Sequence, residues 1–460
     1  MIEQNGAATQ NHGTRTHFIG VGGVGMSAVA RIMVARNQAV SGSDAKDLPV
    51  MQELSAAGAR IAVGYARENL GDATVVVAGS AIRADNPELL AAKAAGLPVL
   101  HRSEALANVM GSDRTVAVAG THGKSTTTSM ITVLLRSAGL DPSFAIGANV
   151  PALGVNAASG ESDVFVAEAD ESDGSFLNYR PLISVVTNVE ADHLDHYGTA
   201  EAVDASFDAF TALLPAEGVL IACADDAGAL ALAHRTQERG NTRVILYGTH
   251  PEAQIKVLDT SAGALALEIG DRHYTAHLHV PGVHNALNAA AAFAVALELG
   301  VEPSAAIAGL EAFTGTSRRF ELKGSKRGVR VYDDYAHHPT EVAAALRAAR
   351  SVAGEHRVHV LFQPHLFSRT REFAAEFASS LDLADSVYVL DIYPAREDPI
   401  EGVTSELITA KLRTAAHPVA HPSEAVRLLA ANAQDGDIIL TVGAGDVTAY
   451  GPAIVEALRA

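Results

Sequence analysis

Short apolar runs alternate with stretches of helical spacing along the chain, and polar boundaries divide them into three groups. In the first group, the predicted helix covers 26–38 and the predicted strands cover 16–20, 38–44, 73–82 and 97–103. Strands that alternate with helices predict a parallel, doubly wound sheet. The polar segment GSDRT, at 111–115, predicts a linker after this group.

The second group repeats this alternation and then changes character. Its apolar runs end near polar residues and cover 116–120, 163–170, 182–190, 218–226 and 242–248. The next three runs resemble short antiparallel strands, at 255–259, 264–270 and 274–280. Two helices are predicted after them, over 284–300 and 304–313. This group therefore predicts an α/β domain that carries a small antiparallel sheet.

The third group follows the boundary segment GTSRRFE, at 315–321, and is again α/β. Its predicted helix starts at Glu341, and its predicted strands lie within 329–339, 359–364, 386–394 and 437–446. We therefore expect an α/β protein with three domains, at 14–112, 113–314 and 315–460. Ligands of open parallel sheets bind beyond the carboxyl ends of the strands, where most polar clusters of this chain fall.

Length and composition agree with this division. At about 100–200 residues per domain, 460 residues suggest about three domains. Hydrophobic residues make up 48% and charged residues 19%, which is typical of a globular protein. The formal charge of −19 argues against a nucleic-acid partner, because a phosphate backbone requires a basic face. A small anion remains compatible with this charge, because a nest of backbone N–H groups binds anions locally.

The expected compartment follows from what the sequence lacks. Cys223 is the only cysteine, so no intrachain disulfide forms, and a reducing cytoplasm is expected. The first residues, MIEQNGAATQNHG, do not have the basic and then apolar pattern of a signal peptide. No apolar run approaches the ~20 residues that span a bilayer, so membrane insertion is not expected.

The stretch VAVAGTHGKSTTTS, at 116–129, predicts a phosphate-binding loop between a strand and a helix. Lys124 would neutralise terminal phosphates, and the hydroxyl of Ser125 would bind Mg²⁺. Val118 stands where the full motif has its first glycine, so a plain glycine-rich turn before a capped helix is the alternative. The expected ATP-binding residues here are Gly120, Thr121, His122, Gly123, Lys124, Ser125 and Thr126.

Two acidic segments end apolar strands downstream of this loop. In the first, Glu168 and Asp170 could reach a metal held by Ser125, and a solvated acidic loop is the alternative. In the second, NVEADHLDHY, an imidazole from His193 accompanies carboxylates. A metal site and a pH-sensitive polar turn explain this second segment equally well from spacing alone.

The segment GVGGVG, at 20–25, fits the dinucleotide fingerprint, with Asp44 ending the next strand. By itself this pattern favours NAD, but it specifies only a close approach of the backbone to a pyrophosphate. A UDP-sugar carries a pyrophosphate too. Glycines that serve only helix–strand packing are the third alternative.

These segments together resemble the Mur ligases of bacterial cell-wall synthesis. The resemblance covers nearly the whole chain and is carried by FIGVGGVGMS, GTHGKSTTT, EADESDGSF, NVEADHLDHY, PGVHNALNAAAA, GTSRRFE, DDYAHHPTE and QPHLFSRT. It implies a Rossmann-like amino-terminal domain for a UDP-sugar, a central P-loop ATPase-type domain, and a Rossmann-like carboxyl-terminal domain for an amino acid. The implied reaction uses ATP and Mg²⁺ to join L-alanine to the carboxylate of UDP-N-acetylmuramate through an acyl phosphate.

The resemblance also implies roles for single residues. Ser125 and Glu168 match the ligands of the Mg²⁺ that bridges ATP, and His193 matches a ligand of a second metal. Lys124, His193 and Arg369 are the expected catalytic residues. The remaining nucleotide-binding residues that it implies are Asn285, Asn288, Arg319 and Asp334. The UDP-sugar set is Gly20, Gly22, Gly23, Gly25, Asp44 and Ser80, and the amino-acid set is His337, His365 and Arg369.

Two departures from the family pattern limit this transfer. Leu366 and Phe367 stand where other members often have Arg and Tyr, and Tyr65 stands where many have His. The segment VDASFDAF has no lysine, so no carbamylated lysine is expected. The expected partners are the two small-molecule substrates, and the expected state is a monomer or weak homodimer.

Three rival functions remain open on the sequence. One is a related ligase that recycles cell-wall fragments by joining a tripeptide to the same sugar nucleotide. Another is an NAD-dependent oxidoreductase, and the third is a P-loop switch without ligation chemistry.

Overall fold

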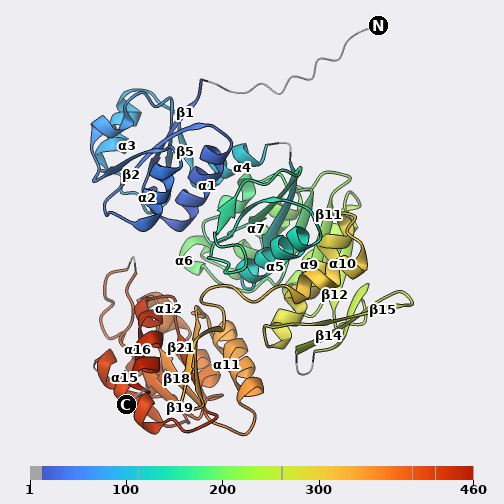
Figure 1. Cartoon of the computed structure of the whole chain (residues 1–460), viewed down its shortest axis with the longest axis vertical. Coiled ribbons are helices and arrows are strands. Elements are labelled where there is room, and N and C mark those ends of the chain that lie inside the picture. Colours follow the sequence, from blue (N-terminus) through green and yellow to red (C-terminus); the bar gives the residue numbers. More distant parts are fainter. Residues whose placement is uncertain (1–12, 112, 261–262, 396, 420, 459–460) are drawn as a thin grey trace.

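The computed structural model describes residues 13–111, 113–260, 263–395, 397–419 and 421–458. Its three sheets confirm the predicted α/β architecture of three domains, which are stacked along the longest axis of the molecule (Figure 1). Segment 1–12, which carries most of the expectation about a signal peptide, lies outside the described residues. Ser112 of the predicted linker does too.

The amino-terminal domain has five parallel strands in the order β3-β2-β1-β4-β5. The strands are β1 (Arg15–Ile19), β2 (Ala39–Asp44), β3 (Arg60–Val63), β4 (Val75–Ala78) and β5 (Val99–His101). The helices are α1 (Val24–Ala35), α2 (Pro49–Ala56), α3 (Pro87–Ala94) and α4 (Arg102–Met110). The strand order reverses at β1, so the glycine turn that follows β1 lies at the position where such sheets bind ligands.

The central domain is built on a ten-stranded sheet in the order β15-β14-β13-β12-β11-β10-β6-β9-β7-β8. Its strands are β6 (Arg114–Ala119), β7 (Ser143–Ala145), β8 (Ala157–Ala158), β9 (Val164–Glu168), β10 (Ile183–Val186), β11 (Val219–Cys223), β12 (Arg243–Gly248), β13 (Ile255–Asp259), β14 (Ala264–Ile269) and β15 (Arg272–His277). The antiparallel strands continue the edge of the parallel sheet, because β13 pairs in parallel with β12 and antiparallel with β14.

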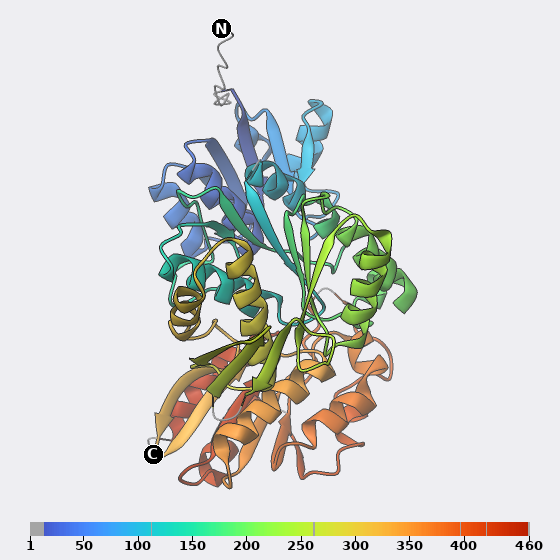
Figure 2. The same ribbon diagram turned by 90° about the vertical axis from the view of Figure 1, so that its right-hand side faces the viewer.

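Helices cover both faces of the central sheet (Figure 2). They are α5 (Lys124–Ser137), α6 (Leu194–Tyr197), α7 (Ala200–Thr211), α8 (Ala227–Arg239), α9 (Val283–Glu298) and α10 (Pro303–Glu311). The alternation along β6 explains this arrangement: Val116 and Val118 enter the core with α5 and α9, whereas Ala117 and Ala119 enter the core with α7 and α8. These four side chains are fully buried, and burying one valine contributes about 1.5–3 kcal/mol.

The carboxyl-terminal domain has six strands in the order β16-β17-β21-β18-β19-β20, of which only the edge pair β16–β17 is antiparallel. The strands are β16 (Glu321–Lys326), β17 (Val329–Asp334), β18 (Val358–Phe362), β19 (Ser386–Val389), β20 (Ala416–Pro418) and β21 (Ile438–Val442). The helices are α11 (Pro339–Ala353), α12 (Phe367–Glu372), α13 (Ala374–Leu381), α14 (Glu406–Thr409), α15 (Pro422–Asn432) and α16 (Tyr450–Ala457). Helix α11 begins before the predicted start at Glu341, because His338 caps it and proline suits its first turn.

Arg36, at the end of α1, anchors the amino-terminal domain to the central one. Its guanidinium donates to the carbonyl of Val109 at 2.5 Å and to Asp113 Oδ2 at 2.9 Å. It also donates to the hydroxyls of Ser143 and Ser159 at 3.1 and 3.2 Å. One side chain therefore joins α1, the start of the central domain and the β7–β8 edge.

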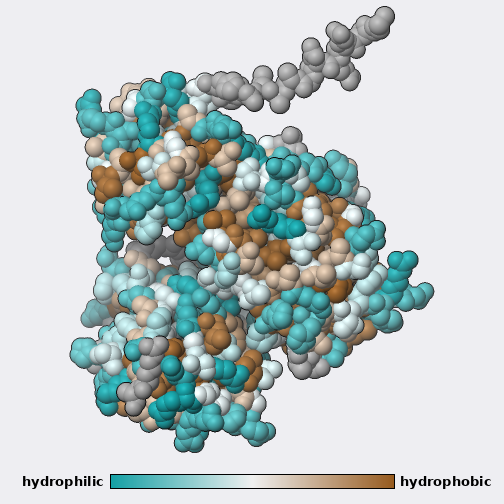
Figure 3. All heavy atoms as spheres, viewed as in Figure 1, coloured by the Kyte–Doolittle hydropathy of each residue, from teal (hydrophilic) through white to brown (hydrophobic). Residues whose placement is uncertain are grey.

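The carboxyl-terminal domain contacts the central domain through Arg369, which donates to Asp192, and through Thr340, which donates to Glu190. The space-filling view shows a hollow between the amino- and carboxyl-terminal domains (Figure 3). Within the part of the chain that the structure describes, no helix has the length and apolar character needed to cross a membrane.

Candidate active site

The phosphate loop between β6 and α5 has the backbone that its glycines permit. Gly120 has a φ of +130°, and a Cβ there would lie 2.1 Å from Thr187 Oγ1. Gly123 has a φ of +84°, and a Cβ there would lie 2.9 Å from Asn288 Oδ1. The first N–H groups of α5 have no partner within the helix, and its dipole favours an anion at this end. The loop is therefore shaped to receive phosphate.

Lys124, the first residue of α5, points back over this loop. Its Nζ donates to the carbonyls of Gly120 and Thr121 at 2.8 and 3.2 Å, and to Glu171 Oε1 at 2.9 Å. Burial by itself lowers the pKa of Lys124, but the nearby charges, first that of Glu171, outweigh it and raise this pKa above its ordinary value. The side chain is therefore a fixed cation beside the loop.

Ser125 and Glu168 come together from different elements, α5 and the end of β9. Ser125 Oγ donates to Glu168 Oε1 at 2.9 Å, and Gly147 N–H donates to Glu168 Oε2 at 2.7 Å. Both residues line a cleft of about 530 Å³, which also contains Lys124 and Asp170. Hydroxyl and carboxylate oxygens are the donors that Mg²⁺ prefers. The donor set expected for the nucleotide-bound metal is therefore assembled.

A chain of charges leads from the phosphate loop to the carboxyl-terminal domain. His193 Nε2 lies 3.6 Å from Glu171 Oε1 and 3.7 Å from Asp192 Oδ2. Arg369 Nη2, from α12, donates to Asp192 Oδ1 at 3.0 Å, and both of these side chains are buried. Burial by itself raises the pKa of Asp192, but the charges of Arg369 and His193 outweigh it and lower this pKa well below its usual range.

A second cavity, of about 160 Å³, lies beside the loop between the central and carboxyl-terminal domains. Asn285 and Asn288 line it from α9, and the first of them donates to the carbonyl of Pro281 at 2.7 Å. Arg319 and Asp334 line it from the other domain. The four residues expected around the nucleoside therefore share one cavity.

Asp334 closes this cavity at the end of β17. Its two carboxylate oxygens accept the N–H groups of Phe320 and Ala336, each at 2.8 Å. Burial raises the pKa of Asp334 to about 6, although Arg319 and these hydrogen bonds oppose the shift. The carboxylate is thus held rigidly, and Arg319 lies next to it.

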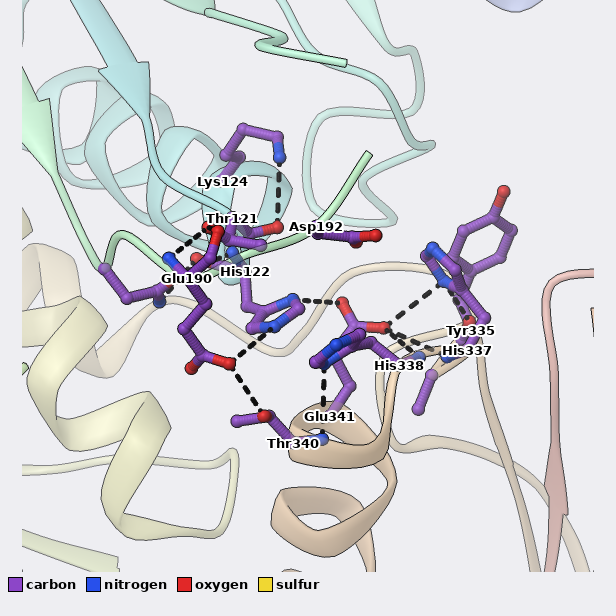
Figure 4. Close-up of polar contacts among 12 residues, drawn as sticks. Thr121, His122, Lys124, Glu190, Asp192, Tyr335, His337, His338, Thr340 and Glu341 are labelled. Carbon is purple, nitrogen blue, oxygen red and sulfur yellow. Dashed lines mark hydrogen bonds and ion pairs between the residues drawn. The ribbon is translucent and has the colours of Figure 1, made fainter. Parts of the chain in front are cut away.

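His122, in the phosphate loop, contacts carboxylates of two domains (Figure 4). Its Nδ1 lies 3.2 Å from Glu341 Oε1 on α11, and its Nε2 lies 3.6 Å from Glu190 Oε2 of the central domain. Thr340 Oγ1 donates to the same oxygen of Glu190 at 2.8 Å. Burial by itself lowers the pKa of His122, but the charges of Glu341 and Glu190 raise it to about 9.

The residues predicted for the amino acid lie along two adjoining clefts. His337 lines the cleft of the phosphate loop, whereas Arg369 lines a cavity of about 390 Å³ below it. The two clefts share Asp192 and His193. His365 lies beside His337, with 5.9 Å between the ring centroids.

The residues predicted for the UDP-sugar come from the turn between β1 and the start of α1, from the end of β2 and from the segment after β4. Asp44 Oδ2 accepts the N–H of Gly22 at 3.0 Å, so these two are in direct contact. Ser80 donates to Asp173 Oδ2 of the central domain at 3.0 Å. Gly25 lines a cavity of about 260 Å³ between the two domains.

The structure adds three charged residues that the sequence analysis did not select. Arg102 lines the cavity beside Gly25, Glu171 holds Lys124, and Glu341 holds His122. Arg102 lies near the end of a predicted strand, at 97–103, and Glu171 follows Glu168 and Asp170 in a segment already marked as acidic. The positions of Arg102 and Glu171 in the sequence could therefore have indicated a role in the site. Glu341 had only the signal of an ordinary helix cap.

Comparison with known proteins agrees with this geometry. The chain matches the models of the Mur ligase family, catalytic domain (residues 15–114), the Mur ligase middle domain (118–296) and the Mur ligase glutamate ligase domain (318–445). The chain belongs to the Mur ligase family. Each of the three domains of the chain therefore matches a domain of that family.

Individual Mur ligases resemble the chain over nearly its full length. It is 73% identical to the UDP-N-acetylmuramate–L-alanine ligase of Paenarthrobacter aurescens, over 96% of this chain and 97% of that one. The crystal structure of UDP-N-acetylmuramate–alanine ligase from Thermotoga maritima is 27% identical, with a TM-score of 0.80 over 97% and 99% of the two chains. The murein peptide ligase from Psychrobacter arcticus is 26% identical, with a TM-score of 0.69 over 97% and 98%.

Proposed function

We propose that this protein is the ATP-dependent ligase that adds L-alanine to the carboxylate of UDP-N-acetylmuramate in peptidoglycan synthesis. The observation that carries the proposal is the cleft of the phosphate loop, which shares residues with a cavity on the amino-terminal side and with another on the carboxyl-terminal side, joined with 73% identity to a relative of that name. ATP would occupy the loop and the cavity of Asn285 and Asp334. The sugar nucleotide would enter from the glycine turn after β1, and alanine from the side of Arg369.

The proposed chemistry requires an activated acid, because a carboxylate resists attack by an amine. Transfer of the γ-phosphate to the carboxylate forms an acyl phosphate and ADP. The amine of alanine then attacks the acyl carbon, and the tetrahedral intermediate expels phosphate to give the amide. Lys124 would offset the negative charge on the phosphate during transfer. Docking of the carboxyl-terminal domain would exclude water, which otherwise hydrolyses the acyl phosphate.

Mg²⁺ is the metal that the family implies, and the side chains present fit it. Ser125 and Glu168 would hold it next to the loop, because they bring a hydroxyl and a carboxylate oxygen to the same point. A magnesium ion supplies charge neutralisation for the transferred phosphate. His193, with Glu171, would hold a second ion near the sugar carboxylate.

The proposed amino-acid site uses Arg369 as the carboxylate clamp, with His337 and His365 beside it. A guanidinium bonds both oxygens of a carboxylate at once. In the structure Arg369 already pairs with Asp192, so the substrate carboxylate would share or replace this partner. The proposed partners are UDP-N-acetylmuramate and L-alanine, and the proposed compartment is the cytoplasm.

The test is phosphate release by the purified protein with ATP and Mg²⁺, with the two substrates added singly and together. We expect release only with both, and a UDP-sugar product heavier by one alanyl residue. Activity with the tripeptide and not with alanine would assign the recycling ligase instead. Release that neither substrate stimulates would contradict a ligase.

A further inference from the structure

Two helices of the carboxyl-terminal domain begin with almost the same sequence. Helix α11 starts within HPTE, at 338–341, and α15 starts within HPSE, at 421–424. Both place proline in the first turn and glutamate after it, which is a pattern for starting a helix. The pattern alone assigns both glutamates the same local role.

The structure separates the two glutamates. Glu424 lies on the exposed surface, and α15 shows no side-chain cap. Glu341 is largely buried, with 10% of its side chain exposed, and completes a capping box, in which His338 is the cap. The similar helix starts therefore differ in their surroundings. That of α11 is largely buried at the domain junction, whereas that of α15 is exposed to solvent.

The two oxygens of Glu341 have different partners. Oε2 serves its own domain: it accepts the N–H of His337 at 2.9 Å and that of His338 at 3.3 Å, and lies 3.2 Å from His337 Nδ1. Oε1 faces outward, 3.2 Å from His122 Nδ1 and 3.7 Å from Arg319 Nη1. Capping needs only Oε2. The contacts of Oε1 therefore require another explanation.

The two oxygens of Glu341 together contact a residue of the phosphate loop, His122, and a residue on the amino-acid side, His337 (Figure 4). His122 is part of the phosphate loop, and its carbonyl accepts hydrogen bonds from Thr187 Oγ1 at 2.5 Å and Asn188 Nδ2 at 3.0 Å. A shift of the imidazole is therefore transmitted to a loop that is held on its other side. His337, beside His365, is on the side of the proposed amino-acid site.

We propose that Glu341 is a positioning residue that couples docking of the carboxyl-terminal domain to alignment of the phosphate loop. It acts through His122 on the loop and through His337 on the amino-acid side, and it touches no reacting atom. This inference rests on the proposed ligase function. Its physical basis is that removing one partner of a largely buried ion pair leaves the other charge uncompensated, so Glu341 and the cations that it faces in the two domains depend on one another.

The decisive variant is Glu341→Gln, which keeps the size and one acceptor oxygen but removes the charge. We expect kcat to fall about 10²-fold, the loss that a misplacement of about 1 Å produces. The KM for ATP should change less than kcat, because the nucleoside cavity keeps its asparagines. The matched control is Glu424→Gln, which changes the same position of the similar helix start and should retain wild-type kcat.

A double-mutant cycle with His122→Gln tests the route. If Glu341 acts through His122, the double variant should be about as slow as either single variant, because the effects of groups in one network do not add. Additive losses would overturn the inference. So would a fall in kcat that is matched by an equal loss of folded, nucleotide-binding protein.

Hydrogen exchange of the loop amides at 120–124 gives a readout that needs no turnover. Glu341→Gln should raise their exchange in the nucleotide-free protein, and Glu424→Gln should not. Unchanged exchange in Glu341→Gln would overturn the coupling even if the wild type makes the alanyl product. Raised exchange in Glu341→Gln, together with a wild type that makes no alanyl product, would support the coupling and show that only the proposed substrate is wrong.

Discussion

Lys124 Nζ lies 2.9 Å from Glu171 Oε1, and the same oxygen faces His193 Nε2 at 3.6 Å. One carboxylate thus holds the cation of the phosphate loop together with the histidine expected to bind a second metal. Phosphate oxygens that approach Lys124 must compete with Glu171. The position of the lysine is therefore tied to the occupancy of both neighbouring sites.

Replacing Lys124 by alanine should nearly abolish turnover. We expect kcat to fall at least about 10²-fold, because the transferred phosphate loses its main protein cation. Steady-state phosphate release measures this. Lys256→Ala is the matched control, since that lysine pairs with Glu268 on the outer strands, at 3.3 Å. A near-normal kcat for Lys124→Ala would remove the residue from the mechanism.

Replacing Arg369 by lysine should raise the KM for alanine about tenfold and leave the affinity for ATP unchanged, because lysine cannot form the two-pronged contact with a carboxylate. Lysine is preferable to alanine here, since a buried Asp192 without its partner destabilises by about 3–5 kcal/mol. Arg413→Lys, in an exposed pair with Asp382, is the control. An unchanged KM for alanine would mean that a residue other than Arg369 binds the carboxylate of alanine.

Replacing Gly120 by alanine should destabilise the protein by more than 1 kcal/mol, since an added Cβ costs about 1–2 kcal/mol in left-handed backbone and overpacking costs about 1–3. The added Cβ would overlap Thr187. Gly139→Ala separates the two effects, because Gly139 also has a positive φ, of +88°, but open space around it. Urea unfolding measures both variants. Equal losses would mean that the contact with Thr187 relaxes.

The pH dependence of domain docking should follow His122. Its pKa of about 9 in the folded protein exceeds the ordinary 6.5, so its stabilising charge is fully present below about pH 6.5 and is lost as pH rises through 9. The groups that face it are Glu341, Glu190 and His338. The Tm advantage of the wild type over His122→Gln should therefore shrink between pH 6.5 and 9. A constant difference across this window would show that the ring is not charged.

Much of the fold was predictable because inner parallel strands of the sheets are short apolar runs, such as β10 (ISVV) and β11 (VLIAC). Strand β16 (Glu321–Lys326) was not predicted, because its sequence ELKGSK is polar. It is an edge strand that pairs only with β17, and edge strands need no apolar run. Strand β16 forms because it pairs with β17 in a hairpin, and the sequence pattern of β16 alone does not reveal this pairing.

The candidate site was predictable wherever a residue type carries its own signal. Lys124 and Ser125 follow a glycine loop, and Glu168 ends an apolar strand, so their meeting followed from the parallel sheet. Glu341 could not be selected in this way. Its distance to His122 depends on how two domains dock, and the equivalent Glu424 shows that the same local sequence occurs without any such contact.

The hydrogen bonds of Arg36 bear on which domains of the molecule can move relative to one another. Arg36 fixes the amino-terminal domain on the central one through hydrogen bonds to both. We therefore expect the amino-terminal and central domains to behave as one rigid body, against which the carboxyl-terminal domain can move. A fragment that ends at the 315–321 boundary should therefore fold as a two-domain unit. Without the carboxyl-terminal domain, it should not turn over substrate.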